Sequence, residues 1–534
     1  MESISFPFLS GMIFLPLLGV ALLFFLNRKS HELLRWVALL FMLADFALSL
    51  VVYYLFDASE AGMQLQEFHP WVPSWGISYK LGIDGISLFL VLLTTLLGPI
   101  VIMASWKDIT YRVKEFLISL LFLQVGMIGV FASLDLFLFY VFWEIMLIPM
   151  YLLIGVWGNP ARKLYAAIKF VLYTIVGSLL MLVAILVLYS MAGEATGQYT
   201  FDLLKLYDFA VPLNAQFWLF LAFFLAFAIK VPMFPFHTWL PDAHTEAPTV
   251  GSVVLAAVLL KMGTYGFIRF AIPLFPNAAM DAAWWISWLA LIGIIYGAWV
   301  AMVQTDVKRL VAFSSVSHLG FVMLGMFAFT MQGVEGSIIQ MINHGLSTGA
   351  LFLMVGMIYE RRHTRLIAEF GGLSRVMPVF AVFFMIFTLS SIGLPGLNGF
   401  VGEFLILLGT FKVHPWYAVI AASGVIFAAV YMLWMYQRVM FGEITNPKNE
   451  NLKDLSAREV ALLLPILLFV VWIGVYPNTF LKPMEPAVKK FIEQVEKKKA
   501  KVLALEGSGT LSEVGKARVA VAARGVKPTD DRKD

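Results

Sequence analysis

The stretch Ile229-Lys-Val-Pro-Met-Phe-Pro-Phe-His-Thr-Trp-Leu-Pro-Asp-Ala-His244 continues an unbroken apolar run that begins at Phe217. It places Lys230 at membrane depth, where a charged side chain costs about 2.5–3.5 kcal/mol on insertion scales unless it meets an opposite charge or water. Pro232 and Pro235 then each remove a backbone donor, and broken backbone inside a bilayer persists only where protein or a polar cavity satisfies it. The stretch therefore predicts a transmembrane helix broken beside a functional lysine. A proline-kinked helix whose lysine snorkels to the surface is the alternative.

The composition is that of a polytopic membrane protein. Of 534 residues, 60% are hydrophobic and 13% are charged, and the mean hydropathy is +0.85; a soluble domain is about 25% charged. With 0 cysteines the chain has no ligands for a cysteine-bound iron–sulfur cluster and no thiolate nucleophile. It also lacks dinucleotide-binding, Walker A and H-E-x-x-H motifs. We therefore expect no cofactor, metal ion or nucleic acid on this chain, and any redox chemistry in partner subunits.

The hydropathy pattern, at about 20 apolar residues per span, predicts an all-α protein with fourteen transmembrane helices. They are expected at residues 6–26, 33–55, 83–104, 115–132, 136–156, 166–191, 215–240, 248–270, 283–302, 309–329, 335–359, 378–408, 416–440 and 459–476. The first is interpreted as a retained span rather than a signal peptide, because Glu2 stands where a signal peptide has basic residues. Basic residues cluster in alternate loops, for example at 28–29 and 361–362, so the positive-inside rule places both termini on the non-cytoplasmic side.

Two of these spans, the seventh and the twelfth, carry helix-breaking residues. They are five spans apart, an odd number, so spans 4–8 and 9–13 are predicted to be inverted repeats, the arrangement known in secondary transporters. The expected division of the chain is 1–110 (three helices), 111–272 (first repeat), 273–442 (second repeat), 443–480 (helix 14) and 481–534 (tail). Within the tail, 482–501 is predicted to be a charged amphipathic helix with Phe491, Ile492 and Val495 on one side and Lys498 on another, followed by disorder.

Five further ionisable residues lie inside predicted spans. Glu144 is surrounded by large apolar residues, Lys261 by small ones, and His318 and His344 by hydroxyls and glycines, while Glu403 follows four glycines and a proline that predict the second break. Taken singly, each has a structural explanation as a hydrogen-bonded core histidine or a protonated structural acid. Together with Lys230 they make six such residues on six spans, and that pattern favours a proton path through the bilayer.

Other polar residues are assigned local roles. Asp135 is expected to cap a helix N-terminus, and Lys169 to snorkel towards a nearby basic loop. His237 and His244 fall at the end of the broken helix, where surface exposure and a functional role both stay open.

Four segments resemble one known family: Trp143 to Pro149, Lys230 to Pro248, Ser314 to Gly320 and Asn343 to Leu346. Over residues 5–480 the chain resembles the antiporter-like membrane subunits of the proton-pumping NADH:quinone oxidoreductase, respiratory complex I, most closely the M type, the counterpart of mitochondrial subunit four. Glu403 separates it from the L- and N-type relatives and from multisubunit cation/proton antiporters, which resemble one another in having a lysine there.

The resemblance also implies roles and partners. Glu144 is expected to pair with Lys230, Lys261 to be the central relay, His318 and His344 to carry protons onward, and Glu403 to end the path. NADH, FMN, iron–sulfur clusters and quinone are expected in partner subunits, with the neighbouring membrane subunits of the complex as partners in the bacterial inner membrane.

Four alternatives stay open. The chain could be a subunit of a multisubunit sodium/proton antiporter, or of a ferredoxin-dependent photosynthetic relative of complex I. It could also be a haem-binding, quinone-reactive cytochrome with His318 and His344 as axial ligands, although haem ligation explains neither buried lysine. A passive scaffold is the last alternative, and it leaves every buried charge unexplained.

Overall fold

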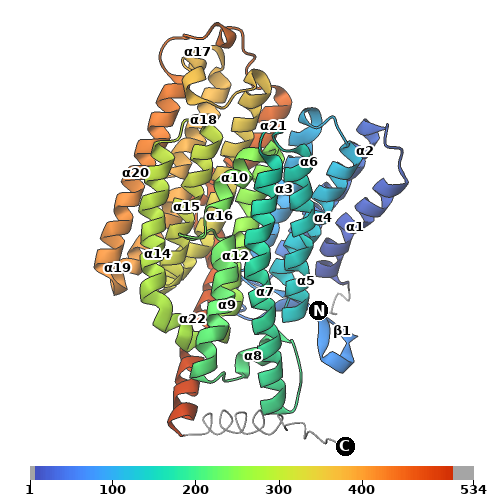
Figure 1. The fold of residues 1–534 in the computed structure, drawn as a ribbon, viewed down its shortest axis with the longest axis vertical. Helices are drawn as coiled ribbons and strands as arrows, with labels where there is room; N and C mark the ends of the chain where they lie inside the picture. Colours follow the sequence, from blue (N-terminus) through green and yellow to red (C-terminus); the bar gives the residue numbers. More distant parts are fainter. Residues whose placement is uncertain (1–5, 509–534) are drawn as a thin grey trace, which may run out of the picture.

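Thirteen helices in residues 6–508, which are the residues that the computed structural model describes, are long and apolar enough to cross a membrane. Most of them run side by side along the long axis of the molecule (Figure 1). The prediction of a polytopic helical membrane protein is therefore confirmed.

The helices of the first half of the chain are α1 (Phe8–Phe25), α2 (His31–Leu55), α3 (Leu88–Asp108), α4 (Val113–Ala132), α5 (Leu136–Ile145), α6 (Leu147–Trp157), α7 (Lys163–Thr196), α8 (Leu203–Asp208), α9 (Leu213–Lys230), α10 (Trp239–Glu246), α11 (Thr249–Val254), α12 (Leu260–Gly266) and α13 (Ile272–Leu274). Those of the second half are α14 (Pro276–Met302), α15 (Val307–Met326), α16 (Met331–Arg362), α17 (Leu373–Val376), α18 (Pro378–Ser391), α19 (Asn398–Val413), α20 (Pro415–Met440), α21 (Ala457–Val475) and α22 (Asn478–Gly507).

The twelfth expected span consists of two short helices, α18 and α19, which is why thirteen long helices are found where fourteen spans were predicted. The chain between them turns at Gly393 and Gly396, whose φ angles of +77° and +93° belong to the left-handed region that glycine adopts without strain. In the seventh expected span, the first helix, α9, likewise ends at Lys230. Both breaks lie where proline and glycine predicted them, whereas the inverted repeat remains a prediction.

The eighth span is less regular than its hydropathy suggested. Between α11, α12 and α13 it contains two π-helical segments, Leu255–Leu259 and Phe267–Ala271. Single π-helical turns inside α-helices frequently occur at functional sites, because the wider turn leaves backbone carbonyls free. In the most apolar 18-residue stretch of each helix, all residues are buried in this span and in α16, and 94% are buried in α15, whereas 33% are buried in α1 and in α2. The three innermost spans are those that carry Lys261, His318 and His344.

One β-hairpin interrupts the all-helical pattern. Strands β1 (Gln64–Val72) and β2 (Ile77–Ile83) pair antiparallel in the connection between α2 and α3. The short 3₁₀ turn between them ends at Gly76, where φ is +66°. The all-α prediction did not include this hairpin, because hydropathy locates transmembrane spans and gives little information about the loops between them.

The C-terminal helix α22 includes the segment 482–501 that was expected to be helical and extends beyond it at both ends. Phe491 and Val495 are buried, as their apolar character suggests. Lys498, expected on the polar side, is also buried. Its Nζ donates to the Leu206 carbonyl oxygen near the end of α8 (3.2 Å), which compensates in part for the loss of water. Burial lowers the pKa of Lys498 to about 7. Residues 509–534 of the expected disordered tail lie outside the described residues.

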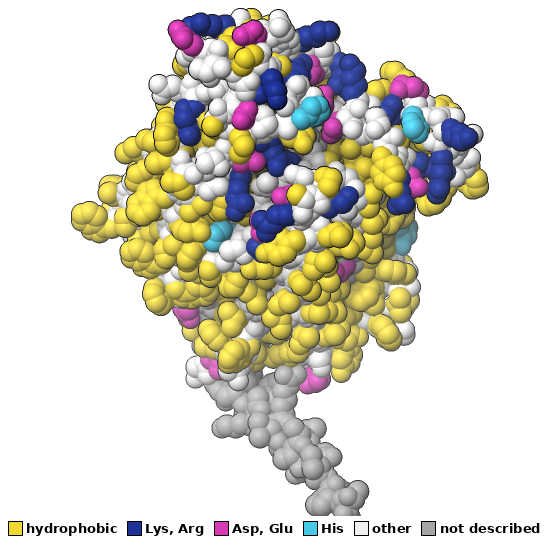
Figure 2. Space-filling view, turned by 45° about the horizontal axis from the view of Figure 1, so that its top comes forward, with side chains coloured by type: hydrophobic (Ala, Val, Ile, Leu, Met, Phe, Trp, Pro, Cys, Tyr) yellow, Lys and Arg dark blue, Asp and Glu magenta, His cyan; other side chains and the backbone are white. Residues whose placement is uncertain are grey.

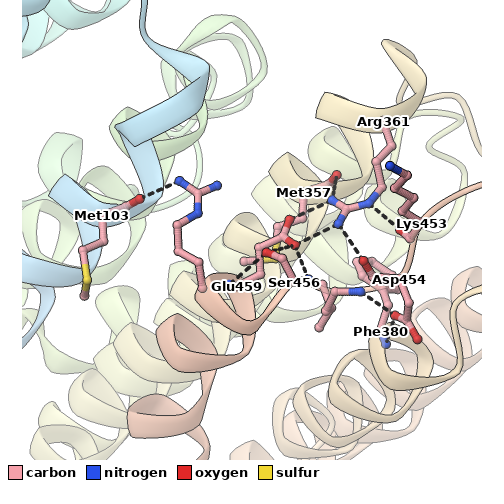
Figure 3. A network of polar contacts seen from close by, with 10 residues as sticks. Met103, Met357, Arg361, Phe380, Lys453, Asp454, Ser456 and Glu459 are labelled. Atoms are coloured by element: carbon pink, nitrogen blue, oxygen red, sulfur yellow. Dashed lines mark hydrogen bonds and ion pairs between the residues drawn. The ribbon is translucent and has the colours of Figure 1, made fainter. Parts of the chain in front are cut away.

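Charge is distributed unequally over the surface. Lys and Arg side chains gather at the end of the molecule that carries α17, and hydrophobic side chains cover most of the side below it in the view of Figure 2. At the same end the Arg361 guanidinium forms a two-pronged ion pair with Glu459, at 2.7 and 2.8 Å, which joins the end of α16 to the start of α21 (Figure 3). Next to it, the Asp454 carboxylate accepts bonds from the Val379 and Phe380 amides at the start of α18, at 2.8 and 3.0 Å. This network fixes α18 relative to α16 and thereby positions the second helix break.

Candidate functional site

Lys261 lies in the centre of the bundle and is completely buried. Its Nζ donates to the carbonyl oxygen of Ala256, in the first π-helical segment, at 2.5 Å, and lies 2.6 Å from His344 Nδ1 on α16. The two spans approach closely because residue 345 is glycine: a Cβ atom there would lie 2.9 Å from the Ala257 carbonyl oxygen. The irregular backbone thus supplies an acceptor for the lysine, and the glycine lets its histidine partner reach it.

The second contact joins His318 on α15 to Glu403 on α19, with 2.8 Å between Nδ1 and Oε1. Both side chains are at most 4% exposed. Gln340 Nε2 donates to the same carboxylate oxygen at 3.2 Å, and Ser391 Oγ lies 3.3 Å from His318 Nε2. Gly402 gives Gln340 the room to reach the acid, since a side chain at residue 402 would collide with the glutamine. The second helix break therefore presents an acid to a buried histidine.

The two pairs lie next to each other. The rings of His318 and His344 are 5.8 Å apart between centroids and inclined at 61°. Both line a cavity of ≈ 10 Å³ whose other walls include Asn343, Ser347 and Ser390. That volume is about the size of one water molecule. Lys261, His344, His318 and Glu403 consequently form a continuous polar row in the interior of the bundle.

Glu144 and Lys230 do not join this row by hydrogen bonds. Within residues 6–508, neither Lys230 Nζ nor Glu144 Oε1 has a hydrogen-bond partner, although both atoms are buried. The expected direct pair between the two side chains is therefore not formed. Instead, the ammonium lies over the rings of Trp143 and Phe170, 5.5 and 5.3 Å from their centroids.

The two buried lysines are nevertheless on adjoining segments. A Cβ atom at Gly263, two residues after Lys261, would lie 2.9 Å from the amide nitrogen of Val231, the residue that follows Lys230. The span of Glu144 is also interrupted, at Met146 between α5 and α6, which hydropathy did not indicate. All six predicted residues are thus buried or partly buried, and the four outside α15 and α16 lie near irregular helix geometry. Lys261 contacts His344, and His318 contacts Glu403.

Two histidines for which surface exposure was one of two alternatives lie in the interior. His244 is 0% and His237 3% exposed. The His244 ring stacks on Phe352 of α16 with 4.6 Å between centroids, and neither ring nitrogen has a hydrogen-bond partner among the described residues. The chain after the break turns back into the bundle, because Trp239 Nε1 donates to the Ile229 carbonyl oxygen at 2.8 Å. No local pattern in the sequence predicts this return.

Other polar residues also differ in part from expectation. Lys169 forms an ion pair with Asp242 at 2.7 Å instead of snorkelling. Arg269, near the end of the eighth expected span, is buried in an ion pair with Asp84 at 2.5 Å. Asp135 does cap α5, as its position suggested, by accepting bonds from the Phe137 and Leu138 amides at 3.0 and 3.1 Å.

The haem alternative does not fit this geometry. His318 and His344 already use one ring nitrogen each on Glu403 and Lys261, and the cavity of ≈ 10 Å³ that they line is far too small for a porphyrin. In the part of the chain that the structure describes, no three His, Asp or Glu side chains are grouped to hold a metal ion. The arrangement consists of two hydrogen-bonded pairs of ionisable side chains, Lys261 with His344 and His318 with Glu403.

A many-helix membrane bundle with two broken helices and a buried row of lysine, histidine and acid defines an antiporter-like membrane subunit. Two family models match the chain: "NADH:quinone oxidoreductase/Mrp antiporter, TM" over residues 133–429 and "NADH-ubiquinone oxidoreductase chain 4, amino terminus" over residues 11–130. The chain therefore belongs to the family of NADH-quinone oxidoreductase subunit M, also named NADH-ubiquinone oxidoreductase chain 4.

Individual members of this family are similar to the chain over nearly its whole length. The chain is 48% identical to NADH-quinone oxidoreductase subunit M of Rhodobacter capsulatus over 502 residues, which cover 91% of this chain and 96% of the relative. It is 46% identical to NADH-ubiquinone oxidoreductase chain 4 of Arabidopsis thaliana, with 91% and 97% covered. Among solved structures, a chain of respiratory complex I from Thermus thermophilus matches with a TM-score of 0.83 and 35% identity, covering 91% of this chain and 99% of that one.

Proposed function

We propose that this chain is a proton-translocating membrane subunit of NADH:quinone oxidoreductase, in which electron transfer from NADH to quinone in partner subunits drives proton movement through this one. The observation that carries the proposal is the continuous contact from Lys261 through His344 and His318 to Glu403. Family membership supports the assignment to this enzyme complex. The polar row supports a role in proton transfer for this chain within the complex.

Each residue has a chemical role in the proposal. Lys261 donates a proton from Nζ to His344 Nδ1, across 2.6 Å. His344 passes one from its other nitrogen towards His318, across the small cavity that their rings line. His318 delivers it from Nδ1 to the Glu403 carboxylate, and each donor is then neutral and ready to be reprotonated. Glu144 and Lys230 act upstream, where a change in the charge of one side chain alters the energy of the proton on the other.

The same proposal places the chain in its surroundings. Its partners are the other membrane subunits of the complex and the lipid bilayer, with NADH, FMN, iron–sulfur clusters and quinone bound by partner subunits. It lies in a bacterial inner membrane. The basic end around α17 is assigned to the cytoplasm and both termini to the opposite side, which the positive-inside rule and the positions of α1 and α22 support. The proposed division of the chain has boundaries after residues 110, 272, 442 and 480, and segments 111–272 and 273–442 are the proposed inverted repeats.

The test begins with the composition of the complex. A tagged copy of this chain, purified from its native membrane, is expected to bring flavin- and iron–sulfur-containing subunits with it. In liposomes this complex should acidify one compartment during NADH-driven quinone reduction. Co-purification with antiporter subunits alone, and sodium-dependent proton exchange without NADH, would establish the antiporter alternative.

A pair of matched variants then tests the role of the chain. Lys261→Met keeps the apolar stem of the buried lysine and removes its proton. Lys412→Met makes the same change at an exposed lysine that donates to Gln332 (2.9 Å). The first change should abolish proton movement through this chain and the second should leave it unaltered; equal activities would contradict the proposed function.

A further inference from the structure

Lys230 is held in an unusual way for a buried ammonium. Its Nζ is completely buried and, among residues 6–508, has no hydrogen-bond acceptor. An ammonium group has three donors and loses its hydration on burial, so it requires a compensating partner. The two aromatic faces of Trp143 and Phe170, at 5.5 and 5.3 Å, are within the ≈ 6 Å over which a ring attracts a cation.

The two rings are fixed by a second layer of aromatic contacts. Trp143 packs against Phe139 and Phe227, with 5.6 and 5.5 Å between centroids. Phe170 packs against Trp239 at 5.4 Å, and the Trp239 indole also bonds the carbonyl oxygen of Ile229, the residue before the lysine. Both rings are completely buried. The geometry of the two faces is thus set in advance, independently of the lysine side chain.

Among the described residues, no charged group on the surrounding helices forms a hydrogen bond with the Lys230 ammonium. Glu144, next to Trp143 on α5, is the carboxylate that acts on Lys230 through space, without a hydrogen bond. Lys169 on α7 is bound to Asp242 of α10 at 2.7 Å, and Lys261 on α12 is bound to Ala256 and His344. Both neighbouring lysines thus have partners of their own, and the aromatic faces remain the contacts of the Lys230 ammonium.

We propose that Trp143 and Phe170 are positioning residues that form a cation seat for Lys230, where its ammonium rests when it is not paired with Glu144. A ring face attracts the protonated lysine and not the neutral amine, so the seat favours a charged Lys230 away from the acid. Because Trp143 and Glu144 are consecutive, the seat and the acid are alternative partners at one place in the bundle. This inference rests on the proposed function and adds to it the residues that decide where the Lys230 charge stays.

The test compares ring removal with ring conservation in the assembled complex. Trp143→Leu and Phe170→Leu remove a face, whereas Trp143→Phe keeps one and loses no hydrogen bond, because the indole Nε1 has no partner among the described residues. Phe116→Leu is the matched control, since it removes a completely buried ring of α4 that packs against Trp157, with 5.2 Å between centroids, and lies over no cation among the described residues. The measured quantity is the pH dependence of NADH-driven proton pumping in liposomes.

We expect each leucine variant to move the pH profile about one unit to lower pH, because loss of a desolvated ring face weakens binding of the charged form about tenfold. Trp143→Phe should keep most of the wild-type profile, and Phe116→Leu should alter only the amount of complex. An unchanged profile in an assembled Trp143→Leu or Phe170→Leu variant, or an equal shift in Phe116→Leu, would overturn the proposal.

Where a leucine variant does not assemble, fluorinated tryptophan at position 143 gives the answer, because fluorine withdraws charge from the ring face at nearly constant shape. A pH profile of pumping that does not change as fluorine is added also refutes the proposal. Lys261→Met separates this failure from failure of the proposed function: if it abolishes pumping while the seat variants have no effect, the relay stands and only the seat is wrong.

Discussion

Replacing Glu403 with glutamine separates the chemistry of the second helix break from its structure. The amide has the shape of the acid, and the break itself depends on Gly393 and the residues around it, so the fold should persist. The Glu403 carboxylate contacts His318 Nδ1 at 2.8 Å and accepts from Gln340 at 3.2 Å. Charge-assisted hydrogen bonds contribute about 1.5–3 kcal/mol and neutral ones about 0.5–1.5, so the change should cost roughly 1 kcal/mol of stability.

The effect on proton transfer should be much larger. A positioned proton acceptor contributes about 10²–10⁴-fold to the rate of a transfer step, equivalent to about 3–5 kcal/mol of barrier. The Glu403→Gln complex should therefore assemble on native gels in wild-type amount, yet transfer protons through this chain at least ~100-fold more slowly in liposomes. Glu485→Gln, the same change at an exposed acid on α22, is the control and should pump normally. Wild-type pumping in Glu403→Gln would refute the assignment of Glu403 as a proton acceptor.

Three further predictions concern other parts of the chain. Glu144→Gln and Lys230→Ala should each leave assembly on native gels intact and abolish pumping, since each removes one of two mutually acting charges; normal pumping in either would exclude that coupling. Gly263→Ala should cost about 1–3 kcal/mol in thermal unfolding of the complex, because its Cβ would lie 2.9 Å from backbone atoms of α9; an unchanged melting temperature would contradict the close approach. Burial lowers the pKa of Lys498 from 10.5 to about 7, so docked α22 binds this proton less tightly than free α22, and its protection from hydrogen exchange should rise from pH 7 towards pH 10. Lys498→Met should remove that rise, and a persistent rise would assign it to another group.

The sequence was informative wherever one residue type has a strong local effect. Proline and glycine located both helix breaks, and hydropathy located the spans, because backbone geometry and transfer from water act residue by residue. The candidate residues were found for the same reason: Lys261 or Glu403 inside an apolar run is costly wherever it lies.

The contacts between those residues could not be predicted in this way. Lys261 and His344 are 83 residues apart, and His318 and Glu403 are 85 apart, so their pairing depends on how distant helices pack. The burial of His244 depends on a chain that turns back into the bundle, and the π-helical turn at Ala256 depends on tertiary packing that overrides local preference. The direct pair of Glu144 with Lys230 was expected from resemblance alone, and two aromatic rings occupy its place.

The measurement that tests the relay most directly is proton pumping by Lys261→Arg in the assembled complex. Arginine keeps a cation beside Ala256 and His344, but its guanidinium stays protonated at any physiological pH and cannot release a proton to the histidine. If Lys261 passes protons, this variant should assemble and pump as poorly as Lys261→Met. If Lys261 is a fixed structural charge, arginine should be tolerated and methionine should be harmful. Normal pumping by an assembled Lys261→Arg complex would contradict the proton path from Lys261 to Glu403.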